Sequence, residues 1–340
     1  MIAPWGPLPL TDAFDAQPTM DHSLLSVTQL LLRAAPALGR PVFVWALGAL
    51  FPVFLPAQHG VLPSPALRAG QALIYQLEFN ASRETQTESP LSGPTLPPSD
   101  ELNAACLLQV EVVGQNSSGF RLKTYLSEKT EPPRSANSAA SRGESAPDKI
   151  VEVSVARNGV ASQIKGLDQL SVAQQFAWNN WLGRFTSTWT YFNSGVHVGS
   201  KWELDDPETT PSPLSRLVWA KKYQYVRNEP CGPSTPSAIG NCAVVLVRAQ
   251  LHQKSSPSHA TPEDFKLHGM VTRGTATGAN ETILYIALAT GLLVRSSEDA
   301  KQSMDATIAL ADGSNEVRYV MKAKSRSQIQ LLSDSSQQVY

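Results

Sequence analysis

Residues 72–79 read ALIYQLEF, and this stretch indicates the kind of fold that the chain adopts. Apolar side chains occupy every second position from Leu73 to Phe79, whereas Gln76 and Glu78 lie between them. Successive side chains of a strand point to opposite faces, so a period of two gathers the apolar set on one face. The stretch is therefore predicted to be a strand with one buried and one solvated face.

Comparable stretches follow along the chain. Two Ser/Thr/Pro-rich segments, 81–100 and 129–148, have no apolar period and are predicted to be loops. Asn158-Gly159 signals a two-residue turn, after which the chain can return antiparallel. The Gly/Thr-rich segment 266–282 fits a strand pair or a ligand-facing loop. Further strands are predicted at 104–113, 119–128, 150–155, 187–192, 196–204, 216–226, 243–251, 281–288, 292–296, 303–311 and 316–324.

One helix is predicted over about residues 167–182, LDQLSVAQQFAWNNWL, in which apolar residues recur near the helical spacing. Gly183 follows and can end the helix in a left-handed cap. Trp178 and Trp181 are three residues apart and share one helical face. Many strands and one helix predict a mainly β (α+β) fold, with a large antiparallel sheet or open β-barrel packed against one amphipathic helix.

An apolar run precedes all of these elements. Residues 41–57 read PVFVWALGALFPVFLPA, with Arg33 and Arg40 ahead of them and no charge inside. A basic flank, an apolar core and a small final residue are the parts of a secretory signal peptide. An uncleaved anchor helix and a buried core segment are the alternatives, and translation from Met20 is a further hypothesis.

A signal peptide at residues 41–57 predicts an exported protein that resides in the periplasm, in the outer cell envelope or outside the cell. Residues 1–57 are then an N-terminal extension with a signal peptide or anchor, and residues 58–340 are a β-rich exported domain. The acidic, Pro-rich segment 205–215 leaves open a division into two subdomains. A single wrapped sheet is equally compatible with the pattern.

The charge of the chain excludes some classes of partner. Without residues 1–57, which hold two Arg and three Asp, basic and acidic residues balance. This balance argues against nucleic acid as a partner and against a polybasic membrane patch.

Cys231 and Cys242 bracket a turn-rich loop and are predicted to form a disulfide in an oxidising compartment. Cys106 lies in an apolar strand and is predicted to be a buried thiol.

The sequence offers no recognisable catalytic residue, metal site or cofactor motif. Ser162-x-x-Lys165 matches a penicillin-recognising nucleophile motif, but its companion motifs are missing. Asp205, Asp206 and Glu208 could be paired carboxylates and are better interpreted as solvated loop acids. The six histidines follow no metal-ligand spacing.

The order of the motifs resembles a loosely defined group of exported bacterial β-sheet proteins of unknown function. The matching positions are Gly70-Leu73-Tyr75 in the opening strand, Gly199-Trp202 in a turn, and Thr290-Gly291-Leu292-Leu293 in a late turn. More remotely, strands wrapped on a helix are similar to the outer-membrane lipoprotein carrier family, in which an open barrel shelters acyl chains. This resemblance is structural, and it assigns no functional residue.

Three functions follow from these observations as hypotheses. The first is an exported, non-enzymatic binding or carrier module for a hydrophobic or lipid-like ligand. Its ligand would lie in a cleft lined by Trp178, Trp181, Trp189, Tyr191 and Trp202. The second is a structural or interaction protein of the cell envelope with a filled core. The third is a hydrolase with an unrecognised site. The partner would be a hydrophobic small molecule or an envelope protein, with membrane contact only through residues 41–57 if these are not cleaved.

Overall fold

The computed structural model describes residues 65–89, 93–94, 99–128, 149–187, 189, 195–208, 212–232, 240–257 and 260–335. The chain divides into two compact units, Met1–Leu55 and Pro56–Tyr340, and every described residue belongs to the second. The predicted leader at 41–57, the start at Met20 and most of the predicted strand 187–192 lie outside the described residues.

The described part is mainly β, with one long helix and two short helical segments. The strands are β1 (Ala72–Ser89), β2 (Gly93–Pro94), β3 (Ser99–Gln115), β4 (Gly119–Glu128), β5 (Lys149–Ala156), β6 (Ala161–Lys165), β7 (Lys201–Pro207), β8 (Leu217–Pro230), β9 (Asn241–Gln253), β10 (Met270–Ala287), β11 (Leu293–Leu310) and β12 (Val317–Asp334). The helices are α1 (Val172–Thr186), the short α2 (Glu263–Leu267) and a 3₁₀ turn at Leu167–Gln169.

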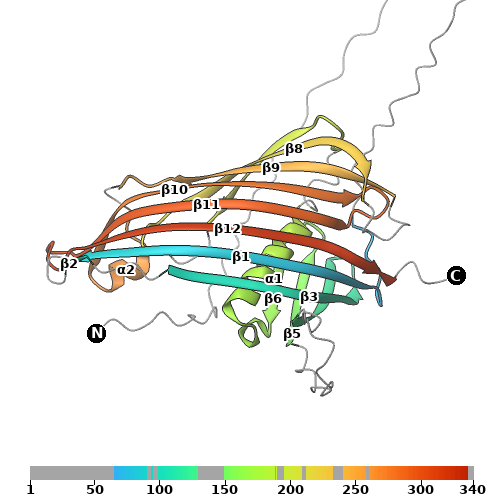
Figure 1. Ribbon diagram of the computed structural model, residues 1–340, viewed down its shortest axis with the longest axis horizontal. Helices are drawn as coiled ribbons and strands as arrows, with labels where there is room; N and C mark the ends of the chain where they lie inside the picture. Colours follow the sequence, from blue (N-terminus) through green and yellow to red (C-terminus); the bar gives the residue numbers. More distant parts are fainter. Residues whose placement is uncertain are drawn as a thin grey trace, which may run out of the picture. The chain divides into compact units, whose positions relative to one another are not determined.

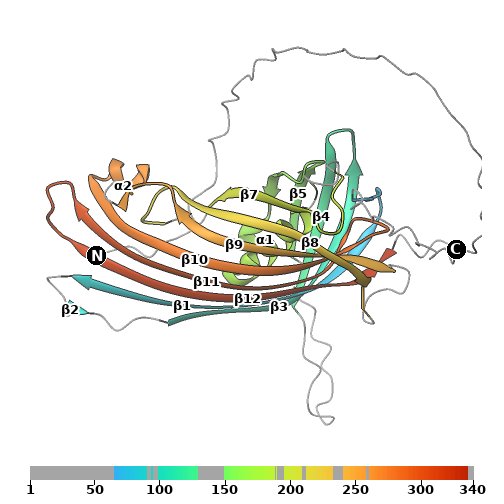
Figure 2. The same ribbon diagram turned by 90° about the horizontal axis from the view of Figure 1, so that it is seen from above.

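All the strands belong to one antiparallel sheet with the order β6-β5-β4-β3-β1-β12-β11-β10-β9-β8-β7, and β2 pairs with β1 (Figure 1). Two meanders therefore meet at the centre, where β12 returns to lie beside β1. Helix α1 follows β6 at one edge of the sheet and precedes β7 at the other. The sheet curves around α1, which lies on its inner face (Figure 2).

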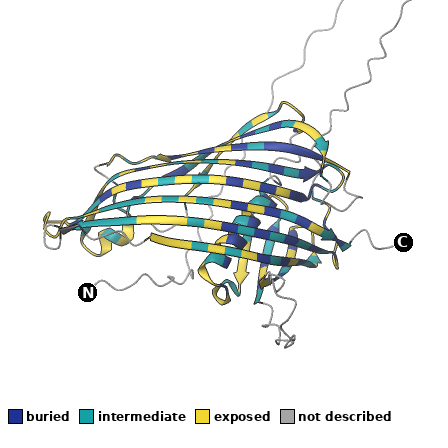
Figure 3. Ribbon diagram, in the orientation of Figure 1, coloured by how far each residue is buried: buried dark blue, intermediate teal, exposed yellow. Residues whose placement is uncertain are grey.

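The predicted alternation of the first strand is confirmed. Leu73, Tyr75, Leu77 and Phe79 are buried on the inner face of β1, and α1 packs against this face and that of β3. In Figure 1 the helix lies behind β1 and β3, so the viewer sees their outer face. Figure 3 shows the resulting alternation of buried and exposed residues along the central strands. The structure thus has the predicted fold class, a large antiparallel sheet packed against one helix.

Several predicted boundaries are wrong, mostly because polar strands carry a weak periodic signal. The predicted loop 81–100 is strand at both ends, since β1 continues to Ser89 and β3 begins at Ser99. The strands predicted at 292–296 and 303–311 are one strand, β11, and most of segment 266–282 belongs to β10. Backbone pairing with neighbours on both sides sustains these strands where apolar residues are few.

The helix also differs from its prediction at both ends. It begins at Val172, where Ser171 and Gln174 form a reciprocal capping box. Gly183 does not end it, because Phe185 and Thr186 beyond that glycine are buried and hold another turn against the sheet. No helix among the described residues has the length and apolar content to cross a membrane.

The predicted disulfide is confirmed. Cys231 and Cys242 are bonded, with sulfur atoms 2.00 Å apart, and they join the end of β8 to the start of β9. Cys106 is the free thiol of the described part and is buried, as its sequence context predicted. The possible subdomain boundary 205–215 begins inside β7, which includes Asp205, Asp206 and Pro207, and β7 and β8 are neighbours in the same sheet.

Candidate functional site

Aromatic side chains fill the space between α1 and the sheet. Trp178, Trp181 and Phe185 of α1 are each at most 1% exposed. The Trp181 ring stacks on Phe185 at a centroid distance of 5.0 Å and contacts the ring of Tyr75 at 5.9 Å. Trp189 joins the cluster through Phe185, at 5.3 Å. Three of the predicted ligand-binding residues therefore meet in one continuous, closely packed core.

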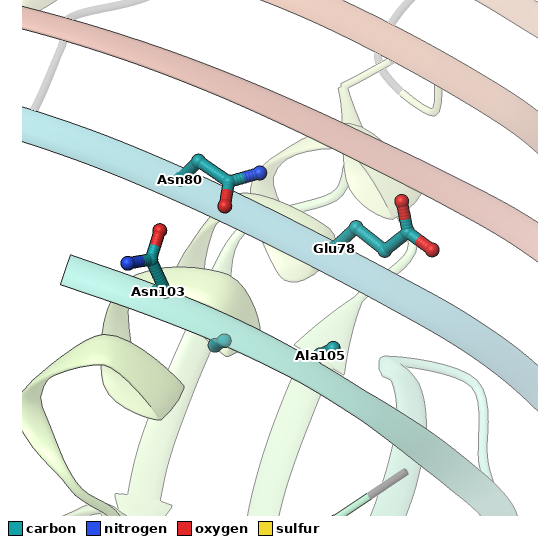
Figure 4. A pocket seen from close by; sticks show the side chains of 5 residues that line it. Glu78, Asn80, Asn103 and Ala105 are labelled. Atoms are coloured by element: carbon teal, nitrogen blue, oxygen red, sulfur yellow. The ribbon is translucent and has the colours of Figure 1, made fainter. Parts of the chain in front are cut away.

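The other two predicted residues lie elsewhere. Trp202 is half-buried on β7 and stacks on Tyr223 of β8, with ring centroids 5.2 Å apart. Tyr191 lies outside the described residues. Two surface hollows, of about 280 Å³ and 210 Å³, are lined by other residues; the first lies between β1 and β3 at Glu78, Asn80 and Asn103 (Figure 4). A ligand-binding role for the five aromatic residues thus stays a prediction.

A polar cluster, which we call the clamp, fastens α1 to the central strands. It consists of Arg184 and Asn180 of α1, Asn280 of β10, Glu298 of β11 and Ser327 of β12. Arg184 forms an ion pair with Glu298. Asn180 Nδ2 donates to Glu298 Oε2 at 2.7 Å, Asn280 Nδ2 donates to Oε1, and Ser327 Oγ donates to Asn180 Oδ1 at 2.9 Å.

The clamp keeps a buried carboxylate charged. Glu298 is 6% exposed, and burial alone would raise its pKa. The Arg184 guanidinium and the hydrogen bonds donated by Arg184, Asn180 and Asn280 oppose this effect and hold the pKa of Glu298 below its ordinary value. A charge held this way fixes the position of α1 on the sheet.

The sequence reasoning missed the clamp entirely. Glu298 lies in the gap between the two strands predicted for β11, so its face could not be assigned. Had the strand been drawn as continuous, the even positions of 296–306 would have placed an acid among inner-face residues. Arg184 in the last turn of the helix would then have been the matching cation.

The clamp lies in a row of residues that crosses the central strands. Phe79, Ser327 and Glu298 are register neighbours that form one row across β1, β12 and β11. In the described part of the chain, the ring contacts and hydrogen bonds from α1 to these strands reach no further than this row. Beyond it β1 and β12 each run about ten more residues, roughly 33 Å at 3.3 Å per residue.

Beyond the row the inner face first carries small and polar residues, among them Arg83, Gln302 and Ser325, and apolar side chains gather farther along. A second cluster of buried residues, which we call the distal cluster, contains Met304 and Ala306 of β11 together with Leu214, Leu217, Leu251, Ala260 and Ala276. Trp219, Tyr319 and Met321 pack against it and remain half-buried. Because Gly278 lacks a side chain, the Trp219 ring can lie close to β10: a Cβ at Gly278 would be 2.7 Å from its Cη2 atom.

The residues that the sequence offered as possible catalytic groups have structural partners or lie exposed. Asp205 pairs with Lys254 at 2.7 Å, Asp206 pairs with Lys221, and Glu208 accepts a hydrogen bond from Trp219 Nε1 at 2.7 Å. Ser162 and Lys165 are exposed on β6. No group of three His, Cys, Asp or Glu residues suited to a metal occurs among the described residues.

No protein-family model matches this chain, and no curated protein matches it in sequence. Lipovitellin, in a structure that concerns lipid–protein interactions, is 12% identical with a TM-score of 0.36; the match covers 78% of this chain and 25% of that one. The outer membrane protein OprG of Pseudomonas aeruginosa is 8% identical with a TM-score of 0.19, covering 78% of this chain and 96% of that one. The attachment invasion protein Ail of Yersinia pestis is 6% identical with a TM-score of 0.11, covering 77% and 99%.

The chain therefore matches only about a quarter of the lipovitellin chain. These likenesses assign no family to the chain, and the resemblance to the lipoprotein carrier family stays a prediction.

Proposed function

We propose that this protein is an exported, non-enzymatic binding module that holds an elongated hydrophobic ligand on the inner face of its sheet. The ligand lies beyond the clamp, against Trp219, Tyr319 and Met321. The observation that carries the proposal is the length of the sheet beyond the clamp row, about ten residues of β1 and β12, together with the half-buried apolar side chains at the distal cluster.

The chemistry of this surface suits an apolar chain of variable shape. Met321 lies directly opposite Met304 in the register of β11 and β12. Methionine is flexible and polarisable, and it is common on surfaces that accept different apolar partners. Tyr319 and Trp219 add large rings, which dominate the energetics of apolar contact. A concave apolar surface with few polar groups is typical of a small-molecule site.

The proposal moves the ligand away from the position that the sequence suggested. Trp178, Trp181 and Trp189 are at most 2% exposed and contact other rings, so a ligand among them would have to displace packed side chains. Trp202 is half-buried, and its stacked pair with Tyr223 could still contribute to a binding surface.

An exported location is part of the proposal. The disulfide between Cys231 and Cys242 supports it, because disulfides persist mainly in oxidising compartments. Residues 41–57 would supply the export signal.

The proposal is tested by the uptake of a fluorescent fatty acid by two charge variants of neighbouring residues. Met321→Lys places an ammonium on the inner face, and Val320→Lys places it on the outer face; both positions are half-buried. We expect Met321→Lys to weaken uptake at least tenfold and Val320→Lys to leave it unchanged. Absence of uptake by the unaltered protein, or equal uptake by both variants, contradicts the proposal.

The filled interface between α1 and the sheet favours a second function, that of a structural or interaction protein of the cell envelope. Its core needs no ligand, because aromatic rings already occupy the space. Native mass spectrometry separates the two functions: a binding module releases a bound apolar molecule on denaturation, whereas an interaction protein retains its mass.

A further inference from the structure

Opposite charges pair across the strands on the outer face of the central sheet. Arg318 of β12 pairs with Asp305 of β11 at 2.7 Å, and Arg326 pairs with Asp299 at 2.8 Å. The same arrangement occurs for Arg248 with Glu281 across β9 and β10, at 2.9 Å. Opposite charges at facing positions stabilise a sheet, and like charges there destabilise it.

One place on this face breaks the rule. Lys301 of β11 lies directly opposite Lys324 of β12 in the register, and Lys322 lies two residues along on the same face. All three are exposed, and none forms an ion pair within the described part of the chain. Glu84 of β1 is the register neighbour of Lys322, yet these two form no ion pair either. We call these three lysines the lysine patch.

The surroundings of the lysine patch are polar, and they include the carboxylates of Glu84, Asp299 and Asp305, of which the last two pair with Arg326 and Arg318. Facing side chains on paired strands have Cβ atoms roughly 5 Å apart, and alternate residues of one strand are about 6.6 Å apart. Three ammonium groups can therefore converge on one anionic group. Thr277 and Ser303 beside the patch share a hydrogen bond of 2.9 Å between hydroxyl oxygens, and the hollow of about 210 Å³ is lined by both of them and by Lys322.

Like charges at facing positions destabilise a sheet, and an external anion would relieve the repulsion between Lys301 and Lys324. Although the overall charge balance argued against a polybasic membrane patch, the register concentrates three lysines locally, and we propose that the lysine patch docks the outer face of the sheet on an anionic bilayer surface, with lipid phosphates as the counter-ions. Lysine is a point charge on a flexible stem, which suits a fluid layer of phosphates, whereas enclosed phosphate sites favour the fixed fork of arginine. The patch is open, and among the described residues no large aromatic one of the kind that anchors protein interfaces lines the hollow beside it.

The expected strength follows from the number of charges. Each lysine near an anionic bilayer strengthens binding about fivefold, so three together contribute on the order of 100-fold. The contribution declines with salt, because the screening length falls from about 10 Å at 0.1 M to about 3 Å at 1 M. This surface is separate from the inner face proposed for the hydrophobic ligand, so either can fail without the other.

The test is co-sedimentation of the full-length protein with vesicles of neutral phosphatidylcholine or of phosphatidylcholine with phosphatidylglycerol. Residues 41–57 can bind both, so the quantity compared is the ratio of anionic to neutral binding. The variant is Lys301→Gln, Lys322→Gln and Lys324→Gln together. The control with the same net charge is Lys165→Gln, Lys201→Gln and Lys222→Gln together. These three lysines are exposed on β6, β7 and β8.

We expect a ratio on the order of 100 for the unaltered protein and for the control, falling toward one in the lysine-patch variant and at 1 M salt. Equal ratios for variant and unaltered protein overturn the proposal. The proposal is also overturned if inorganic phosphate displaces the protein from anionic vesicles more strongly than chloride does at equal ionic strength. The patch would then be a site for a free anion.

Discussion

Replacing Arg184 by Met tests whether the clamp holds α1 on the sheet. The Arg184 side chain is 14% exposed and that of Glu298 is 7% exposed, so this ion pair is shielded from water. Removing one partner of a buried pair leaves an uncompensated charge and typically lowers stability by about 3–5 kcal/mol. Asn180 and Asn280 still donate to Glu298, so we expect a loss near the lower end, about 3 kcal/mol at pH 7.

The loss should depend on pH in a defined direction. In the unaltered protein the pKa of Glu298 is below its ordinary value, so the clamp contributes stability above about pH 4.3 and loses it as the pH falls through the folded-state pKa. Without Arg184, burial dominates and raises the pKa of Glu298 above its unfolded value. Protonation of Glu298 then removes the buried charge of the variant. The difference in stability between the variant and the unaltered protein therefore shrinks as the pH falls from 7 to 4.

The assay is reversible urea unfolding followed by tryptophan fluorescence and circular dichroism. Arg326→Met is the matched control, because its pair with Asp299 is exposed and should contribute only about 0.2–1 kcal/mol. Adding Glu298→Gln to Arg184→Met should recover most of the loss, since no buried charge remains. A loss below about 1 kcal/mol, or one that grows on acidification, refutes this reasoning.

Three further predictions concern other parts of the fold. Cys231→Ser with Cys242→Ser should lower the free energy of unfolding by about 3 kcal/mol, and a reducing agent should lower it equally in the unaltered protein but not in the variant. Gly278→Ala should destabilise by about 1–3 kcal/mol, because its Cβ would meet Trp219; Gly183→Ala, in open space on α1, should instead stabilise by about 0.5–1 kcal/mol in the same unfolding assay. Burial, with a contribution from Glu128, raises the pKa of Cys106 to about 11, so a thiol reagent at pH 8 should label it only after unfolding, and rapid native labelling would show an open strand.

Strands with alternating apolar residues were predictable from the sequence, and those with polar inner faces were not. The alternation from Leu73 to Phe79 identifies β1 because apolar side chains there face α1. Beyond the clamp, inner positions of β11 hold Ala300 and Gln302, so no apolar period remains although the backbone pairing continues. Nor does a local pattern indicate that β12 pairs with β1, since that pairing joins residues at least 230 positions apart.

The candidate site was predictable to a similar degree. The tryptophan face of α1 was visible from helical spacing, and the disulfide from the position of its two cysteines. Whether an aromatic face lines a cleft or fills a core depends on what it contacts, and Tyr75 and Phe120 come from distant strands. The clamp, the distal cluster and the lysine patch arise from registers among β10, β11 and β12, which a single sequence does not encode locally.

The central claim is that the inner face beyond the clamp, and not the aromatic core, binds the hydrophobic ligand. Photoaffinity labelling with a diazirine fatty acid, followed by peptide mapping, locates the contact directly. The account predicts labels on inner-face residues of β12 and on β8, at Tyr319, Met321 and Trp219. Labels on Trp178, Trp181 or Trp189, or labelling confined to residues 41–57, would contradict it.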